Sequence, residues 1–208
     1  MEYRLDGINQ VAVNSKAGLT FASTLRSILR QDPDIIMIGE IRDAETAQIA
    51  VRAAITGHLV LSTMHTNDTA ATVTRLVDMG IEPFLVSSSV VGVVAQRLVR
   101  KLCDRCKVKY CTTPQEELIL GEKEIYLYRS EGCNYCNHTG YKGRIAIHEV
   151  MPINKDIRGV IDKRGSVDEV RDIALETGTK LLRDNCVELV KEGITSMDEL
   201  LRVTYNFD

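Results

Sequence analysis

The two C-x-x-C pairs of this chain restrict its fold more than any other sequence feature. They are CDRC at residues 103–106 and CNYC at residues 133–136, separated by 26 residues. Each pair forms a compact knuckle that directs two thiolates toward one point, and two knuckles complete a tetrahedral site. The spacing therefore predicts a structural Zn²⁺ site. Its ligands would be Cys103, Cys106, Cys133 and Cys136.

Three other interpretations of these cysteines stay open. The thiols can be reduced and metal-free, they can hold an iron centre of the rubredoxin type, or a pair can act in redox chemistry. The redox interpretation is the weakest, because two pairs in one segment suit a shared metal. Of the six cysteines, Cys111 fits the spacing of neither pair. Cys186 lies in an amphipathic segment, which predicts a core position.

The composition is that of an ordinary globular protein. Of 208 residues, 44% are hydrophobic and 26% are charged, which suits one large domain or two small ones. A net charge of -3 favours neither a nucleic acid nor an anionic membrane as partner. No window is apolar over the roughly 18 residues that a membrane span needs, and the N-terminus lacks a secretion-signal pattern. We therefore expect a cytoplasmic protein.

The order of apolar and polar segments predicts three parts. Residues 1–99 alternate short apolar runs with helix-period segments, which indicates an α/β fold with a parallel-type sheet. Residues 100–150 contain five of the six cysteines and form the expected zinc module with short strands. Residues 151–208 predict a helical subdomain, because their segments carry helix caps or terminal glycines. Within the first part we expect strands at 8–13, 35–41 and 59–64 and helices at 20–31, 44–57, 68–80 and 83–98.

The segment PDIIMIGEIRDAET at 33–46 places a carboxylate directly after an apolar run. The run suits a parallel strand buried on both faces, and chemistry in open parallel sheets lies beyond the carboxyl ends of the strands. Glu40 stands at that place. A carboxylate there can hold Mg²⁺ through water or polarise the water that attacks a γ-phosphate. The alternative is a strand that only happens to reach the surface at a glutamate, and Asp43 suits a helix N-cap.

A second polar tip follows the next predicted strand. LVLSTMHTND at 59–68 runs from apolar residues into polar ones that include His65. If the two strands are neighbours, Glu40 and His65 share one edge of the sheet. An imidazole can donate to a γ-phosphate from one nitrogen while the other is anchored, so the pair predicts a nucleotide site. The alternative for His65 is an ordinary surface histidine at the end of a strand.

These residues carry a resemblance to a known family. The passage LRQDPDIIMIGEIRDAETAQIAVRAAITGHLVLSTMHTNDTAATVTRLVDMGI, residues 29–81, resembles the secretion ATPases that drive type II secretion and type IV pilus assembly. In that family the strand ending in Gly-Glu is the Walker B element, and TGHLVLSTMHTN matches the histidine box. The resemblance therefore implies that Glu40 and His65 are catalytic residues that also contact the nucleotide.

The same resemblance implies an architecture and partners. Residues 1–99 would be the C-terminal part of a RecA-like core that assembles as a hexameric ring and binds ATP with Mg²⁺ between subunit domains. Hydrolysis would move an inner-membrane platform protein, which places the chain in the cytoplasm at the inner face of the cytoplasmic membrane. No nucleic-acid partner is expected. QRLVRKLCDRC and GCNYCNHTGYKGRIAIHEV also resemble the tetracysteine module of assembly-type members, which retraction-type members lack.

One departure from the family pattern concerns the phosphate loop. The motif G-x-x-x-x-G-K-S/T, whose backbone amides and lysine hold the phosphates, does not occur in the sequence. EYRLDGINQVAVN resembles the segment directly after the family's aspartate box, with Glu2 as the trailing acid of that box. We therefore expect Met1 to lie mid-domain and the chain to be a C-terminal fragment that is inactive alone. An alternative function is a zinc-ribbon module that docks a protein partner without its own catalysis.

Overall fold

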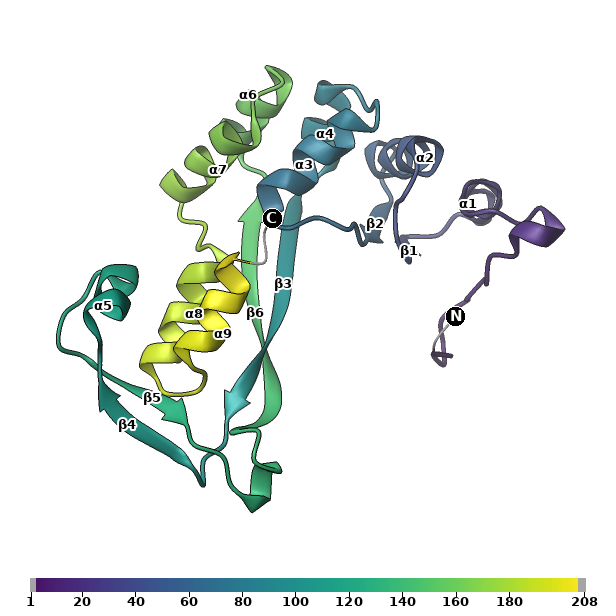
Figure 1. Cartoon of the computed structure of the whole chain (residues 1–208). Coiled ribbons are helices and arrows are strands. Elements are labelled where there is room, and N and C mark those ends of the chain that lie inside the picture. Colours follow the sequence, from purple (N-terminus) through teal and green to yellow (C-terminus); the bar gives the residue numbers. More distant parts are fainter. Residues whose placement is uncertain (1–2, 206–208) are drawn as a thin grey trace. The chain divides into compact units, whose positions relative to one another are not determined.

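The computed structural model describes residues 3–205 (Figure 1), so the predicted box residue Glu2 lies outside the described residues. The chain divides into two compact units, and neither is continuous in sequence. The first unit comprises Met1–Thr66, Ala70–Gly92 and Ile153–Ile173, and the second comprises Asn67–Thr69, Val93–Pro152 and Ala174–Asp208. The boundaries expected after residues 99 and 150 stay a prediction, because both units draw on more than one of the three predicted parts.

The first unit is an α/β assembly. Its helix α1 starts where predicted, because the Thr20 side chain accepts from the backbone N–H of Ser23 in a capping box. Helix α4 packs against α2 and α6. The elements that lie wholly or mostly in this unit are η1 (Ser15–Ala17), α1 (Phe21–Ile28), η2 (Leu29–Gln31), β1 (Ile35–Ile38), α2 (Ala44–Ile55), β2 (Leu59–Ser62), α3 (Thr69–Asp78), α4 (Pro83–Ser89), α6 (Lys155–Asp162) and α7 (Val167–Glu176).

Strands β1 and β2 pair in parallel, as expected from their apolar runs, with Ile35 opposite Leu59 and Ile38 opposite Ser62. The prediction that the β1 run is buried on both faces is wrong. Ile36 and Ile38 are buried, whereas Ile35 and Met37 are 62% and 73% exposed. The side chains of β1 alternate between exposed and buried, so the rest of the described chain covers only one face of this strand.

Two other expectations for residues 1–99 are also wrong. No strand forms at 8–13, where the exposed apolar residues have no pairing partner within the described chain and only an isolated bridge joins Asn14 to Leu19. The helix predicted over 83–98 ends at Ser89, where Val90 is already extended. The run GVVAQRLVRKL then forms strand β3, since β-branched residues favour a pleated, partly buried strand. Arg97 therefore lies on a strand.

The second unit combines two strand pairs with helices. Strand β3 pairs with β6, and β4 pairs antiparallel with β5. The strands expected in residues 100–150 and the helices expected in residues 151–208 are present, whereas helix α5 was not predicted. The elements of this unit are β3 (Gly92–Leu102), β4 (Lys107–Cys111), α5 (Pro114–Leu120), β5 (Tyr126–Ser130), η3 (Asn134–Cys136), β6 (Tyr141–Pro152), α8 (Leu182–Lys191) and α9 (Met197–Tyr205).

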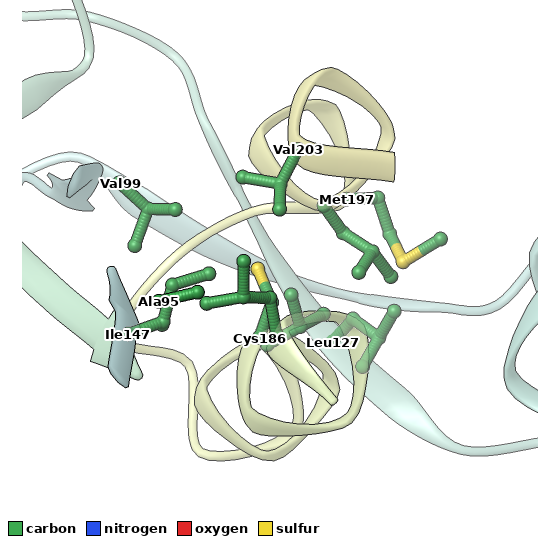
Figure 2. Packing of buried hydrophobic residues seen from close by; sticks show 10 residues of the cluster. Ala95, Val99, Leu127, Ile147, Cys186, Met197 and Val203 are labelled. Atoms are coloured by element: carbon green, nitrogen blue, oxygen red, sulfur yellow. The ribbon is translucent and has the colours of Figure 1, made fainter. Parts of the chain in front are cut away.

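The core of the second unit lies where α8 and α9 cover the strands. Figure 2 shows Cys186 of α8 among side chains from the strands and from α9, and its thiol is fully buried as predicted. Burying apolar area in this way contributes about 25 cal/mol per Å² to folding. The buried residues of the cluster are Ala95, Val99, Leu127, Ile147, Leu182, Cys186, Val190, Met197, Leu200 and Val203. Among residues 3–205, no helix combines the length and apolarity needed to cross a membrane.

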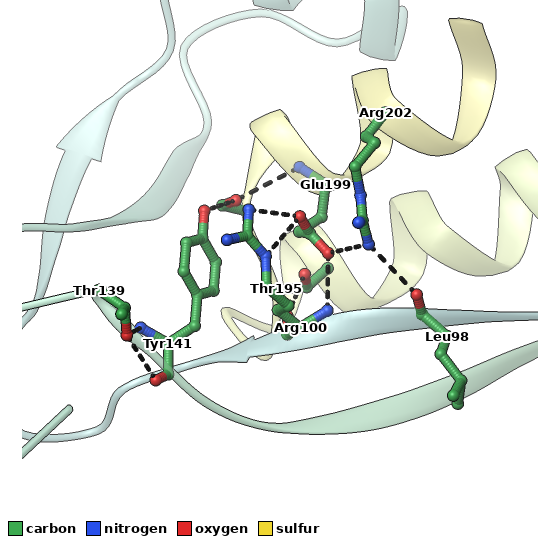
Figure 3. A network of polar contacts seen from close by, with 8 residues as sticks. Leu98, Arg100, Thr139, Tyr141, Thr195, Glu199 and Arg202 are labelled. Carbon is green, nitrogen blue, oxygen red and sulfur yellow. Dashed lines mark hydrogen bonds and ion pairs between the residues drawn. The ribbon is translucent and has the colours of Figure 1, made fainter. Parts of the chain in front are cut away.

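A buried carboxylate ties α9 to β3. Glu199, fully buried, accepts hydrogen bonds from the backbone N–H and Nε of Arg100 at 2.7 and 2.9 Å. Arg202 donates from Nη2 to Oε2, the oxygen that also accepts from the Arg100 backbone N–H, at 2.8 Å (Figure 3). The Arg100 guanidinium also lies 4.0 Å from the ring centroid of Tyr141, whose hydroxyl contacts Ser196 at 2.7 Å. The contacts compensate the charge that burial would otherwise penalise.

Candidate functional site

Glu40 and His65 lie beyond the carboxyl ends of two adjacent parallel strands, β1 and β2. The polar tips of these strands are joined to each other. Thr63 donates from Oγ1 to the carbonyl of Gly39 at 2.6 Å, and the backbone N–H of Ile41 donates to the carbonyl of Thr63 at 3.0 Å. These bonds extend the register past the last paired residues. The expectation that the two strands are neighbours is therefore confirmed.

The structure brings Glu40 and His65 into direct contact. His65 Nε2 lies 3.0 Å from Glu40 Oε2, and Arg42 Nε lies 2.6 Å from the same oxygen. Because an ionised carboxylate only accepts hydrogen bonds, the contact needs a proton on Nε2. The hydrogen bond from Arg42, opposed by desolvation and assisted by His65, lowers the pKa of Glu40 below its ordinary value of 4.5. Glu40 is thus ionised near neutral pH.

The arrangement leaves both groups accessible to a ligand. The Glu40 side chain is 23% exposed and that of His65 is 83% exposed. Within residues 3–205, Glu40 Oε1 has no hydrogen-bond partner, since both contacts are made by Oε2. An ionised oxygen in this position can accept a hydrogen bond from water or take part in water-mediated contact with a cation. Sequence reasoning missed Arg42 as a partner of Glu40, although its position two residues later is a usable signal.

Asp43 behaves as the predicted helix cap. Its Oδ1 accepts from the backbone N–H of Thr46 at 2.7 Å and its Oδ2 accepts from the Thr46 hydroxyl at 3.0 Å. Both carboxylate oxygens therefore serve the start of α2. The contacts of His58 are also structural, because its Nδ1 lies 3.0 Å from the carbonyl of Ala53. Neither residue forms part of the Glu40 and His65 pair.

A second candidate site is the cluster of four cysteines in the second unit. The sulfurs of Cys103, Cys106, Cys133 and Cys136 all lie within 4.8 Å of one another. Three of the separations are 3.9, 3.8 and 3.8 Å. Four thiolates placed tetrahedrally around one ion at a Zn–S distance of about 2.3 Å stand about 3.8 Å apart. The cluster can therefore hold a metal ion. Cys111 lies outside it, as expected.

Backbone amides of the second knuckle point at one of these sulfurs. The N–H groups of Cys133 and Gly140 both donate to Cys136 Sγ at 3.2 Å. Burial disfavours the thiolate form of Cys136, but the hydrogen bonds to that form outweigh the effect of burial. The pKa of Cys136 is therefore lowered to about 6. Burial instead raises the pKa of Cys106 to about 12, and hydrogen bonds with the neighbouring thiols add to the shift. The amides would stabilise a metal-bound thiolate in the same way.

Comparison with known proteins places the chain in a family. The family model for type II/IV secretion system proteins matches residues 1–202. The chain belongs to this family. The resemblance derived from residues 29–81 and from the cysteine segments is therefore confirmed.

Curated relatives within this family include both pilus and secretion proteins. The chain is 51% identical over 209 residues to the type IV pilus assembly ATPase PilB of Thermus thermophilus, covering 98% of this chain and 24% of that protein. It is 48% identical over 207 residues to the type II secretion system ATPase E of Vibrio cholerae, covering 98% of this chain and 41% of that protein. The chain thus spans less than half the length of either relative.

Solved structures of related ATPases share the fold of this secretion family member. The pilus retraction motor PilT with bound ADP superposes with a TM-score of 0.63 at 26% identity, over 88% of this chain and 43% of that one. The ATPase DotB of Legionella pneumophila gives a TM-score of 0.64 at 22% identity, over 97% of this chain and 48% of that one. The expected α/β fold class is therefore confirmed.

Proposed function

We propose that this chain forms part of an ATPase motor for type IV pilus assembly or type II protein secretion, and that it supplies Glu40 and His65 to ATP hydrolysis. The observation that carries the proposal is the direct contact between these side chains at the ends of β1 and β2. The names of the relatives support the activity, since both PilB and the secretion protein E are ATPases.

In this proposal Glu40 acts on the attacking water. Its pKa is held low by the hydrogen bond from Arg42, so the carboxylate is available as an acceptor at neutral pH. His65, protonated at Nε2, donates to Oε2 and so fixes the orientation of the carboxylate. Oε1 then accepts a hydrogen bond from the water. Bound ATP with Mg²⁺ would supply the reacting phosphate and neutralise its charge.

Further parts of the proposal concern the assembly and the metal. Because the 208 residues contain no P-loop, we propose that this chain alone does not turn over ATP. The complete motor would form a hexameric ring at the inner face of the cytoplasmic membrane and act on an inner-membrane platform protein. Zn²⁺ would be held by the four clustered cysteines, because their sulfur separations fit the tetrahedral geometry of that ion.

The test is the substitution Glu40→Gln in the complete motor. The amide keeps the size of the side chain but cannot act as a base, so we expect kcat for ATP to fall on the order of 100-fold or more. Nucleotide binding, measured by titration with a fluorescent ATP analogue, should stay unchanged.

Glu45→Gln is the matched control. Glu45 lies on α2 near Glu40 but forms an exposed ion pair with Arg26 at 2.7 Å, so its loss should leave hydrolysis at the wild-type rate. Wild-type turnover in Glu40→Gln would overturn the role assigned to Glu40.

A further inference from the structure

The two cysteine knuckles of the second unit are built in the same way. In each C-x-x-C pair the backbone N–H of the second cysteine donates to the carbonyl of the first at 3.2 Å. The residue directly before the second cysteine therefore occupies an equivalent place in each turn. It is Arg105 in the first knuckle and Tyr135 in the second.

These two side chains are in contact with each other. The Arg105 guanidinium lies 3.9 Å from the centroid of the Tyr135 ring. The ammonium of Lys142, near the start of β6, also lies 3.9 Å from this centroid, and it donates to the carbonyl of Tyr135 at 3.3 Å. The negative face of an aromatic ring attracts such cations. We call Arg105, Tyr135 and Lys142 the knuckle stack.

Other contacts of the same unit bring the knuckles together at their ends. In the β4–β5 hairpin, Lys107, directly after the first cysteine pair, lies opposite Ser130, three residues before the second. The N–H of Cys103 also donates to the carbonyl of Gly140 at 2.9 Å. These contacts connect the ends of the knuckles, whereas the knuckle stack connects residues inside the two turns.

The knuckle stack has two properties that suit a Zn²⁺ site. None of its three side chains belongs to the four clustered cysteines, so its contacts need no metal. Its cations add positive charge beside a cluster whose four thiolates carry more negative charge than one Zn²⁺ ion neutralises. Arg105 and Tyr135 directly precede Cys106 and Cys136, whose sulfurs are 3.8 Å apart. A contact between the two preceding residues therefore limits how far these sulfurs can separate.

We propose that the knuckle stack is a clamp that keeps the two knuckles close to the spacing of the occupied zinc site, with Tyr135 as its central positioning residue. A preformed spacing reduces the ordering that metal binding must bring about, so the clamp strengthens binding and slows release. Metal removal still loosens the knuckles, because the stack replaces only a small part of four metal bonds. The effect on Zn²⁺ rests on the proposed zinc site, whereas the clamp itself rests on the contacts.

The first test measures the Zn²⁺ affinity of the chain with Tyr135→Leu, by competition with a chromophoric chelator. Tyr135 is 46% exposed, so the variant should fold. Leucine keeps an apolar side chain but offers no ring, so both cation–π contacts are lost without a change of charge. We expect the affinity to fall on the order of tenfold, since each exposed contact of this kind contributes a few-fold, and zinc to pass to the chelator faster. Tyr135→Phe keeps the ring and should bind zinc as the wild type does.

Tyr126→Leu is the matched control. Tyr126 is an exposed tyrosine of the same unit, and Lys109 lies 4.6 Å from its ring centroid. It stands opposite Cys111, at the end of the hairpin that is remote from the knuckles. Its replacement should leave the zinc affinity unchanged. Wild-type affinity in Tyr135→Leu, or equal losses in Tyr126→Leu and Tyr135→Leu, would overturn the proposal.

A double-mutant cycle separates the contact from the charge. Arg105→Gln removes both the cation–π contact and a positive charge near the thiolates. It should weaken zinc binding in the wild type and weaken it less in a Tyr135→Leu background, where the contact is already lost. Equal effects in the two backgrounds would show that Arg105 acts through its charge alone, which would contradict the clamp.

The last test needs no metal. In the reduced, metal-free chain, the Tyr135 ring should shift the NMR resonances of the Lys142 side chain away from their solvated positions, and Tyr135→Leu should return them. Solvated Lys142 resonances in the metal-free wild type would overturn the proposal. If elemental analysis finds no zinc in the purified chain, the proposed metal fails, whereas the Lys142 resonances still decide whether the knuckle stack forms.

Discussion

At the scale of single residues, Gly140 is a position where the cysteine cluster tolerates little change. Its N–H donates to Cys136 Sγ at 3.2 Å, and its carbonyl accepts from the backbone N–H of Cys103 at 2.9 Å. One residue thus connects both knuckles. Its φ is +77°, and an added Cβ would lie 2.2 Å from Cβ of Ser130, so a side chain there must displace the backbone.

Gly140→Ala should therefore weaken metal binding by about 10-fold to 100-fold, the usual cost of losing an outer hydrogen bond to a ligand. Competition with a chromophoric Zn²⁺ chelator measures the affinity. Gly143→Ala is the control, because Gly143 has a similar φ of +78° but nothing within 4 Å of the added Cβ. Equal affinities in the two variants would mean that the Gly140 bonds do not support the metal site.

The residue-scale predictions succeeded where the chemistry is local. The cysteine spacing predicted the cluster, and the polar tips of two apolar runs predicted that Glu40 and His65 share one edge of the sheet, where the two side chains are in contact. Glu149, a buried carboxylate of β6, gave no signal, because its partners Thr69 and Leu182 are 80 and 33 residues away. A buried carboxylate that bonds backbone amides of distant helices has no sequence pattern, since any residue can supply an N–H group.

At the scale of elements, the attachment of α9 to β3 depends on Glu199. Glu199→Gln leaves the shape intact but replaces charge-assisted bonds to Arg100, so we expect the free energy of unfolding to fall by about 2 kcal/mol at neutral pH. Burial opposes the charge of Glu199, but the bonds from Arg100 prevail and hold its pKa below the ordinary 4.5. A carboxylate whose pKa is lower in the folded than in the unfolded state stabilises the fold fully at pH values above its unfolded-state pKa.

The stabilisation from Glu199 should therefore be lost as the pH falls below 4.5 through the folded-state pKa. Urea unfolding of wild type and Glu199→Gln at neutral and acidic pH checks both points, because the difference between them should shrink on acidification. Glu188→Gln on α8 is the control, since Glu188 forms an exposed pair with Lys180 at 2.6 Å and should change stability by less than about 1 kcal/mol. A difference that stays constant with pH would contradict the role of the Glu199 charge.

The element predictions failed where packing overrides a helical pattern. Residues 83–98 are apolar enough for a buried helix, but the β-branched run around Gly92 pairs with β6 instead. Residues 8–13 alternate as a strand does, yet no described neighbour offers a ladder, so the backbone stays irregular. The first error concerns a segment whose structure is set by a partner far away in the sequence, whereas the second concerns a segment for which the described residues supply no such partner.

At the scale of the whole molecule, each of the two units combines stretches that are far apart in the sequence. Three separate stretches build each unit, and the chain passes between the units around Asn67–Thr69, near Gly92, near Ile153 and near Ile173. A change of composition along a chain can suggest a domain boundary, but it does not show which strands pair. Strand β6 pairs with β3, which begins about 50 residues earlier. Long-range pairing of this kind follows from tertiary packing, which local patterns do not encode.

Metal removal should loosen the turn between α8 and α9, because the cysteine knuckles are bonded to it. The N–H of Leu102 donates to the carbonyl of Ile194 at 2.8 Å, and Lys107 Nζ donates to that of Gly193 at 3.0 Å. Both donors flank the first knuckle. When the metal leaves, four thiols share one small space without the bonds that a metal ion provides, so the knuckles should loosen and the turn should lose its anchors.

Elemental analysis of the reduced protein should find about one zinc per chain. Chelation should then speed amide hydrogen exchange around the knuckles and at residues 193–195, whereas β1 and β2 in the first unit should keep their protection. Adding Zn²⁺ back should restore the slow exchange, which excludes chelator damage. Uniformly faster exchange in both units would mean that the metal supports the entire chain. Unchanged exchange at 193–195 would mean that the turn is held without it, because packing of Tyr128 against Gly193 would then suffice.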